Sequence, residues 1–220
     1  MPSPTHRRAE LGPAIGPDHR PRAPDPWHYA GVRIEQTDLF DVLLLVPEPF
    51  RDERGLFTRT FDADEFDAHL QVPGAAAAFV QDSQSRSIRG VVRGMHGRSG
   101  RGEGKLVRCA RGAIHDVLVD IRPDSPTFAR QQAFRLDDND FRQLYIPPGL
   151  LHGFQALTEE ADVCYRMDRP HDPREDVAVA YDDPELAIDW PLPVTVVSAR
   201  DRAAGSWAEL LPTLHRHRTR

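Results

Sequence analysis

Polar and apolar residues alternate over short stretches between residues 31 and 205, and Gly, Pro or Asp turns separate these stretches. Alternation with a period of two points successive side chains to opposite faces, which is typical of half-buried β-strands. Many short strands at regular spacing predict a closed or nearly closed β-barrel. The clearest strand is residues 114–121, IHDVLVDI. The other predicted strands are residues 32–35, 42–46, 55–61, 78–82, 91–95, 106–109, 129–136, 143–146, 153–157, 163–167 and 177–181.

Two short helices are predicted beside the strands. In residues 62–70, Asp62 can cap the first turn, and Phe66 and Leu70 fall on one face. A second helix is predicted at residues 206–211, with the hydroxyl of Ser206 as its cap. The pattern therefore predicts an all-β protein with a few short helices.

The chain divides into three parts by composition. Residues 1–26 hold seven prolines and few large apolar side chains, so residues 1–30 are predicted to form a disordered tail. Residues 31–205 form the predicted β domain. Residues 206–220 are expected to be a short C-terminal helix followed by a frayed basic end. A single domain of this size is common among all-β barrels.

Composition excludes several classes of protein. No run of 18 apolar residues predicts a membrane span, and no apolar stretch typical of a signal peptide follows the start, so we expect a cytoplasmic protein. A net charge of −6 argues against a nucleic-acid partner. Cys109 and Cys164 both lie in apolar, strand-like segments, and we interpret them as reduced core residues.

The most informative stretch for chemistry is residues 85–120. Arg93 and His96 lie near the end of a predicted strand, and a loop rich in Gly and Arg follows at residues 97–104. Lys105 comes next, and it is the single lysine among 28 lysines and arginines. An ammonium is a compact point charge, whereas a guanidinium is wide and planar. A lone lysine therefore indicates a site at which a guanidinium would not be suitable. The stretch predicts an anion-binding pocket.

A second segment, residues 146–154, carries the arrangement P-x-G-x-x-H, which ends at His152. This arrangement resembles the second motif of cupin jelly rolls, so the predicted fold is a cupin-type jelly-roll β-barrel. Metal-binding cupins would use His96, Glu103 and His152 as ligands here. Arg98 stands where those proteins have another histidine, and its positive charge opposes a metal ion. A metal-dependent cupin enzyme is therefore an alternative to the interpretation that follows.

Motifs in their order along the chain make the resemblance specific, from about residue 34 to residue 201. The sequence resembles the dTDP-4-dehydrorhamnose 3,5-epimerase family of cupin-type sugar-nucleotide epimerases. The matching pieces are DERG at residues 52–55, QD at 81–82 with Ser85, GVVRGMH at 90–96, KLVR at 105–108, residues 116–122 with SPTF at 125–128, residues 146–154, Tyr165, DDP at 182–184, DWP at 189–191 and SARD at 198–201.

The resemblance implies an isomerase that acts on a dTDP-linked 4-keto-6-deoxyhexose and inverts C3, C5 or both, without a cofactor or a metal. By this resemblance His96 is the base and Asp201 holds its other ring nitrogen. Tyr165 is the acid on the opposite face, and Lys105 faces the C4 oxygen. Each residue also has a structural alternative: His96 as a core histidine, Tyr165 as a packed aromatic side chain, and Asp201 as a helix cap.

The resemblance also implies a set of substrate contacts and a homodimer. Arg54 and Arg93 fit the diphosphate, because guanidinium groups bind it in a bidentate manner. His152 either contacts the sugar or supports the turn. The remaining predicted contacts are Arg59, Gln81, Ser83, Asp176 and Arg200.

The sequence departs from the family at four of those contacts: Arg59, Ser83, Asp176 and Arg200. It departs again at His171, near which the family has a tyrosine, and at residues 97–98, where the family has an aromatic residue and a glutamine. These departures leave two further alternatives open. One is an epimerase of a secondary-metabolite pathway that acts at C3 only or at C5 only, and the other is a catalytically silent cupin that binds sugar nucleotides.

Overall fold

A computed structural model describes residues 31–70 and 79–216. The predicted tail and the last residues of the predicted frayed end lie outside these ranges. The strands are β1 (Val32–Gln36), β2 (Leu43–Pro47), β3 (Phe50–Asp52), β4 (Gly55–Phe57), β5 (Gln81–Ile88), β6 (Val92–Arg98), β7 (Lys105–Arg111), β8 (Ala113–Asp120), β9 (Gln131–Asp137), β10 (Gln143–Ile146), β11 (Leu150–Ala156), β12 (Glu160–Met167) and β13 (Asp176–Ala178). The helices are α1 (Ala63–Leu70), α2 (Ala199–Arg202) and α3 (Trp207–Arg216), with a 3₁₀ turn at Pro173–Glu175.

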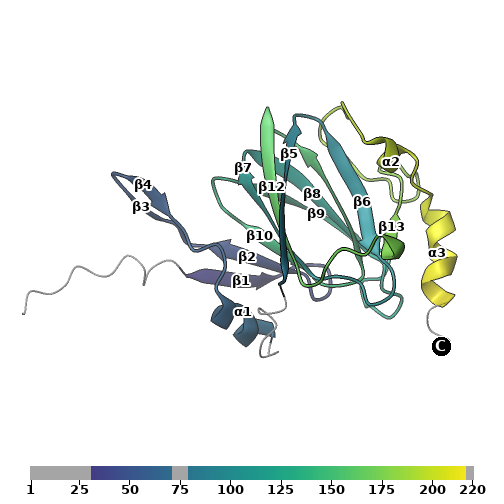
Figure 1. Cartoon of the computed structure of the whole chain (residues 1–220), viewed down its shortest axis with the longest axis horizontal. Coiled ribbons are helices and arrows are strands. Elements are labelled where there is room, and N and C mark those ends of the chain that lie inside the picture. Colours follow the sequence, from purple (N-terminus) through teal and green to yellow (C-terminus); the bar gives the residue numbers. More distant parts are fainter. Residues whose placement is uncertain (1–30, 71–78, 217–220) are drawn as a thin grey trace, which may run out of the picture.

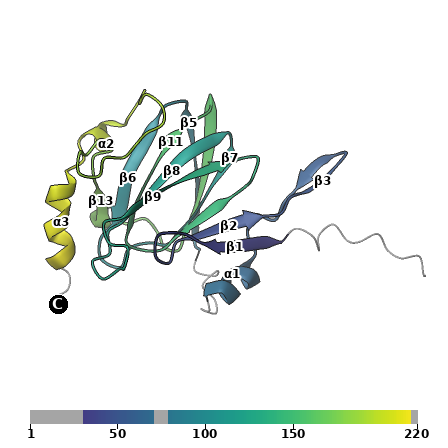
Figure 2. The ribbon, with the colours of Figure 1, turned by 180° about the vertical axis from the view of Figure 1, so that it is seen from behind.

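Two sheets face each other and form the body of the molecule (Figures 1 and 2). One sheet has the strand order β1-β2-β10-β7-β12-β5, and the other has the order β13-β6-β11-β8-β9. Neighbouring strands within each sheet run antiparallel. These two facing sheets confirm the predicted all-β, cupin-type jelly roll.

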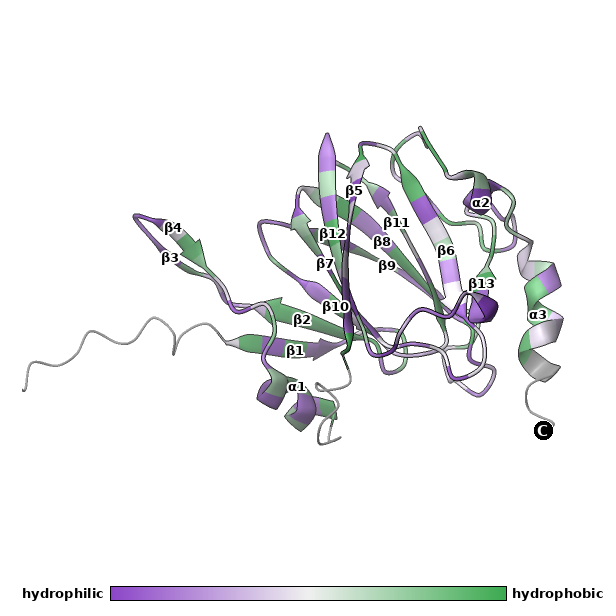
Figure 3. Ribbon diagram, viewed as in Figure 1, coloured by the Kyte–Doolittle hydropathy of each residue, from purple (hydrophilic) through white to green (hydrophobic). Residues whose placement is uncertain are grey.

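The core lies where the two sheets meet, because alternate residues of their strands point inward. Val107 and Val163 come from the six-stranded sheet, and Leu118 and Phe154 from the other; all four are buried in one cluster. Figure 3 shows hydrophobic and hydrophilic residues following one another along these strands. The period-two pattern of the sequence is therefore the pattern that builds the interior.

Helices cover part of the outer face of each sheet. Asp62 caps α1 as predicted, by accepting hydrogen bonds from the backbone N–H groups of Asp64 and Glu65. Phe66 of α1 is buried and its ring lies 5.1 Å from that of Tyr145 on β10; such aromatic pairs add about 0.5–1.5 kcal/mol beyond the burial of their area.

Helix α3 begins with a capping box at Ser206, as the sequence indicates, and packs through Trp207 on the outer face of the five-stranded sheet. None of the helices in the described ranges is long and apolar enough to cross a membrane.

Three elements differ from the pattern-based prediction. The strand expected at residues 78–82 runs instead over Gln81–Ile88, because its sequence QDSQSRSI carries polar residues on both faces and shows no hydrophobic periodicity. The strand expected at residues 55–61 ends at Phe57 and pairs with the unpredicted β3 in a separate hairpin. Helix α2 was not predicted, and Ser198 caps it, so Asp201 lies inside the helix and does not cap it.

Candidate active site

A cavity of about 370 Å³ lies between the two sheets. Its walls come from β5, β7 and β12 of the six-stranded sheet and from β6 and β11 of the other sheet. Polar side chains on the inner faces of these strands point into a space that would otherwise continue the core. Seven of the predicted site residues line this cavity: Gln81, Ser83, Arg93, His96, Lys105, His152 and Tyr165.

A second hollow, of about 320 Å³, lies on the other face of the six-stranded sheet, around Arg108, Cys164 and Arg166. Cys164 and Arg166 flank Tyr165 along β12, so their side chains point away from the first cavity. Among the residues that the structure describes, no histidine or tyrosine lines this hollow. Of these two hollows, the cavity between the sheets is therefore the one that holds groups suited to proton transfer.

His96 on β6 pairs with Asp201, although 105 residues separate them in the chain. The Nε2 atom of His96 lies 2.8 Å from Oδ1 of Asp201, whose side chain is only 5% exposed. Ser198 fixes α2 by accepting a hydrogen bond from the backbone N–H of Asp201. An ionised carboxylate only accepts hydrogen bonds, so Nε2 carries the proton and Nδ1 keeps a lone pair. Burial lowers the pKa of His96 below its ordinary value, although Asp201 opposes that shift.

Tyr165 reaches the cavity from β12, in the opposite sheet. Its hydroxyl lies 3.0 Å from Oγ of Ser85 on the neighbouring strand β5. Burial raises the pKa of Tyr165 well above its ordinary value, and the hydrogen bond between Tyr165 and Ser85 only partly offsets that shift. A phenol with a raised pKa stays protonated at neutral pH, so Tyr165 can donate a proton.

Lys105 lies at the start of β7 and its side chain is 17% exposed. Its Nζ atom is 3.1 Å from Oε1 of Glu103. Oε2 of the same carboxylate is 2.8 Å from Nη2 of Arg98, and Nη2 also lies 2.7 Å from Nδ1 of His171. Arginine has no acceptor, so His171 must offer a lone pair at Nδ1 in this arrangement. All four residues line the cavity.

His152 lies directly opposite His96 in the pairing of β11 with β6. Its Nε2 atom is 2.7 Å from Oδ2 of Asp116, which is fully buried on β8. The His152 ring stands edge-on to the ring of Tyr165, with centroids 6.4 Å apart. The arrangement places a second aspartate–histidine pair between the two groups suited to proton transfer.

Two hydrogen bonds to residues of β5 orient the side chain of Arg93, which comes from β6. Its Nε atom donates to Oγ of Ser87 at 2.9 Å, and its Nη2 atom donates to the carbonyl oxygen of Arg86 at 3.0 Å. The guanidinium is therefore held beside the cavity, and a planar cation in that position suits a phosphate group.

Four predicted substrate contacts lie outside the cavity lining in this chain. Arg54 is on the hairpin of β3 and β4, paired with Asp52, and this hairpin stands apart from both sheets (Figure 1). Arg59 pairs with Asp62 before α1, at 2.9 Å.

Asp176 and Arg200 pair with each other at 2.6 Å, and Oδ2 of Asp176 is 3.7 Å from Nε2 of His171, a residue that lines the cavity. These two predicted contacts are therefore at the rim of the cavity.

The structure also adds residues that the motif analysis did not assign to the site. Ser85, Asp116 and His171 are neighbours of the predicted groups, and Phe154 and Met167 supply apolar wall. A signal existed for Ser85, because it follows Gln81 and Ser83 at a period of two and so shares their face of the strand.

The alternative set of metal ligands is not assembled. His96 contacts Asp201, Glu103 contacts Arg98 and Lys105, and His152 contacts Asp116. Across residues 31–70 and 79–216, no group of three or more His, Cys, Asp or Glu side chains is placed to hold a metal ion.

Comparison with known proteins identifies this site's relatives. The sequence profile described as dTDP-4-dehydrorhamnose 3,5-epimerase matches residues 36–209. A dTDP-4-dehydrorhamnose 3,5-epimerase from Methanothermobacter thermautotrophicus is 40% identical over 79% of this chain and 93% of its own. A dTDP-4-dehydrorhamnose 3-epimerase from Streptomyces niveus is 39% identical over 83% of this chain and 89% of its own.

A solved structure shows the same likeness in three dimensions. The dTDP-6-deoxy-D-glucose-3,5-epimerase from Legionella pneumophila, in complex with dTDP-4-keto-L-rhamnose, matches with a TM-score of 0.77 and 37% identity. That match covers 84% of this chain and 97% of the Legionella chain. Fold, profile and sequence identity agree over most of the chain, which belongs to the dTDP-4-dehydrorhamnose 3,5-epimerase family.

Proposed function

We propose that this protein epimerises C3, C5 or both in a dTDP-linked 4-keto-6-deoxyhexose. One observation carries the proposal: His96 and Tyr165 line the same cavity from opposite sheets. Inversion needs a base on one face of the sugar and an acid on the other. A base on β6 and an acid on β12 meet that requirement. The protons at C3 and C5 are acidic because both carbons adjoin the C4 ketone.

His96 takes the proton from the sugar through Nδ1. Its lowered pKa leaves the imidazole neutral at pH 7, which is the form that accepts a proton. Asp201 keeps the ring in the tautomer with a free Nδ1 and stabilises the imidazolium that forms.

Tyr165 returns a proton to the opposite face, and the hydroxyl of Ser85 steadies the phenolate that remains. Every proton transfer in this proposal is made by a side chain of the chain itself.

The negative charge that develops on the C4 oxygen needs a donor nearby. Lys105 supplies a compact positive charge in a half-enclosed cavity, where such a charge acts more strongly than in water. Arg93 binds the diphosphate, and the Asp176–Arg200 pair at the rim contacts the nucleoside. The ligand named for the Legionella structure, dTDP-4-keto-L-rhamnose, is a sugar nucleotide of this kind.

The deciding experiment follows C3 and C5 separately. The wild-type protein is incubated with dTDP-4-keto-6-deoxyglucose in deuterated water, and NMR records solvent deuterium at each carbon and the configuration of the product. Deuterium and inversion at both carbons mark a 3,5-epimerase. Deuterium at C3 alone marks a 3-epimerase, the activity named for the Streptomyces niveus relative. Binding without exchange at either carbon would contradict the proposal and leave a silent sugar-nucleotide-binding protein.

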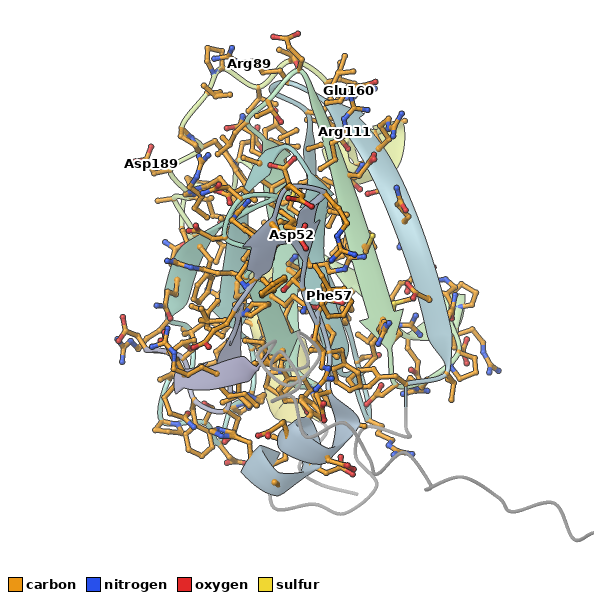
Figure 4. All side chains as sticks on the ribbon, turned by 90° about the vertical axis from the view of Figure 1, so that its left-hand side faces the viewer. Asp52, Phe57, Arg89, Arg111, Glu160 and Asp189 are labelled. Atoms are coloured by element: carbon orange, nitrogen blue, oxygen red, sulfur yellow. The ribbon has the colours of Figure 1, made fainter. Side chains whose placement is uncertain are left out.

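We also expect a homodimer. The hairpin of β3 and β4 projects from the body of the chain, toward the viewer in Figure 4, where Asp52 and Phe57 are labelled. Leu56 on β4, opposite Arg51, is 43% exposed. Exposed strands and apolar side chains of this kind are usually covered by a partner. A second copy placed so that the hairpin reaches its cavity would bring Arg54 to the diphosphate of that copy's substrate.

Light scattering at micromolar concentration measures the oligomeric state directly. The expected mass is twice that of the chain, and a monomer at that concentration would refute the dimer. Replacing Leu56 by aspartate should weaken the dimer, because it places a charge at an exposed apolar position of the hairpin.

The His96–Asp201 pair predicts a pH dependence with a definite sign. Activity requires neutral His96, so kcat/KM should fall as the pH drops through the pKa of His96, which lies below the ordinary value of 6.5. Asp201 raises that pKa, and so replacing Asp201 by asparagine should move the acid limb of the profile to lower pH while kcat drops. An acid limb of the kcat/KM profile that moves to higher pH in Asp201→Asn would show that Asp201 does not raise the pKa of the base.

A further inference from the structure

One buried carboxylate in the cavity lies between two cations. Glu103, 8% exposed, precedes β7 by two residues and faces Lys105 at 3.1 Å and Arg98 at 2.8 Å. The contact with Arg98 lacks hydrogen-bond geometry, so the attraction there is coulombic. Opposite charges attract strongly where side chains are shielded from water. Removing one partner of such a buried ion pair leaves the other charge unpaired, which destabilises the protein.

The loop that carries Glu103 is tied to the segment after β12. The backbone N–H of Gly104 donates to Oδ1 of Asp168 at 2.9 Å, and Nη1 of Arg169 donates to the carbonyl oxygen of Gly102 at 2.8 Å. The approach is close, since a Cβ on Gly104 would lie 2.8 Å from Oδ2 of Asp168 and the carboxylate would have to shift. The backbone therefore fixes the position of the Glu103 carboxylate before any ligand binds.

Lys105 needs such an anchor. Its ammonium sits on a flexible four-carbon chain, and a catalytic charge must be held within about 0.5 Å of its working position. The ion pair with Glu103 holds Nζ inside the cavity and limits its motion. Two cations and one anion leave a net positive charge in the group, so the carboxylate anchors the ammonium without cancelling the field that Lys105 and Arg98 produce together.

We propose that Glu103 is the positioning residue for Lys105, and that Arg98 holds the other oxygen of the Glu103 carboxylate. This inference rests on the proposed function, because it assigns Lys105 to the enolate oxygen. Glu103 acts through Lys105 and makes no bond to the substrate. Its loss therefore lowers the rate of enolate formation far more than it weakens substrate binding.

A double-mutant cycle tests this dependence. Wild type, Glu103→Gln, Lys105→Met and the double variant are compared for kcat and KM of C–H exchange in deuterated water. Glu103→Gln should lower kcat by on the order of tenfold in the wild type and by less than about twofold in the Lys105→Met background, because residues that act as one unit are not additive. KM should change by less than about twofold, since Glu103 makes no contact with the substrate and ground-state binding is retained.

The matched control is Glu175→Gln. Glu175 is also partly buried and ion-paired, with Arg169 at 2.9 Å beside the same loop, but it does not line the cavity. This variant should keep kcat within about twofold of wild type, as expected for a residue that makes no contact with the reacting groups. Equal losses for Glu175→Gln and Glu103→Gln would show that both act on the loop as a whole and would overturn the proposal.

Folding is controlled by circular dichroism and thermal melting of every variant. Should Glu103→Gln fail to fold, the pair Arg98→Gln with Glu103→Gln removes both charges and replaces them with amides, and the cycle with Lys105→Met is repeated on that background. Equal fold-losses with and without Lys105 would overturn the proposal. Absence of exchange in the wild type would instead refute the proposed function, so the two failures are distinguishable.

Discussion

Replacing His96 by asparagine is expected to abolish deuterium exchange at both C3 and C5. The imidazole is the base at the cavity, and its Nδ1 lone pair has no equivalent in an asparagine side chain. Loss of a general base typically lowers the rate by about 100- to 10,000-fold. The shorter asparagine side chain does not reach Asp201 as Nε2 does, but Ser198 still holds α2, so the local fold should persist. NMR in deuterated water measures the exchange at each carbon.

Two controls accompany His96→Asn. Binding of dTDP by titration calorimetry should be nearly unchanged, because His96 faces the sugar and not the nucleotide in this proposal. His69→Asn, at an exposed histidine of α1 outside the cavity, should keep wild-type exchange. Near wild-type exchange at either carbon in His96→Asn would remove His96 as the base for that carbon.

Replacing Tyr165 by phenylalanine is expected to separate exchange from inversion. His96 can still remove the proton, so deuterium should continue to enter the substrate. Inverted product should fall by about 100-fold or more, because the proton donor on the other face is gone and the enolate is reprotonated from the side it left. The hydrogen bond to Ser85 is lost as well, but the ring and its packing remain.

Measuring deuterium incorporation and product configuration in the same sample separates the two effects. Tyr145→Phe is the matched control, because Tyr145 is partly buried against Phe66 and does not line the cavity. Its exchange and inversion should both match wild type. Should Tyr165→Phe lose exchange and inversion in equal proportion, Tyr165 is not a separate acid on the opposite face.

The sequence pattern predicted most strands to within a few residues, and the misplacement of one strand has a clear physical cause. Strand β10 was predicted with its observed bounds, because the apolar Leu144 and Ile146 alternate with more polar residues in its sequence QLYI. Strand β5 was misplaced, because its face toward the cavity is polar like its outer face. Gln81, Ser83 and Ser85 line the cavity at positions where a strand normally places apolar residues, so the alternation used to predict strands is absent from β5.

The order of motifs, and not any one residue, predicted the candidate site. The resemblance proposed Asp201 as the partner of His96, and the structure places the two side chains 2.8 Å apart. Spacing along the chain offered no such information, since any of the many carboxylates could have been the partner. The structure did not bring Arg54 or Arg59 to the cavity, because Arg54 lies on the projecting hairpin and Arg59 pairs with Asp62 at the start of α1.

Local periodicity was enough to determine that this protein is built from strands, since successive side chains of a strand point to opposite faces. The sequence also determined which proton-transfer groups and cations were available. Only the tertiary structure decided which of them meet. Glu103, a candidate metal ligand by spacing, became the ion-pair partner of Lys105 and Arg98. The physical reason is that contacts inside the cavity depend on the order of strands within each sheet and on how the two sheets face each other, neither of which a period of two encodes.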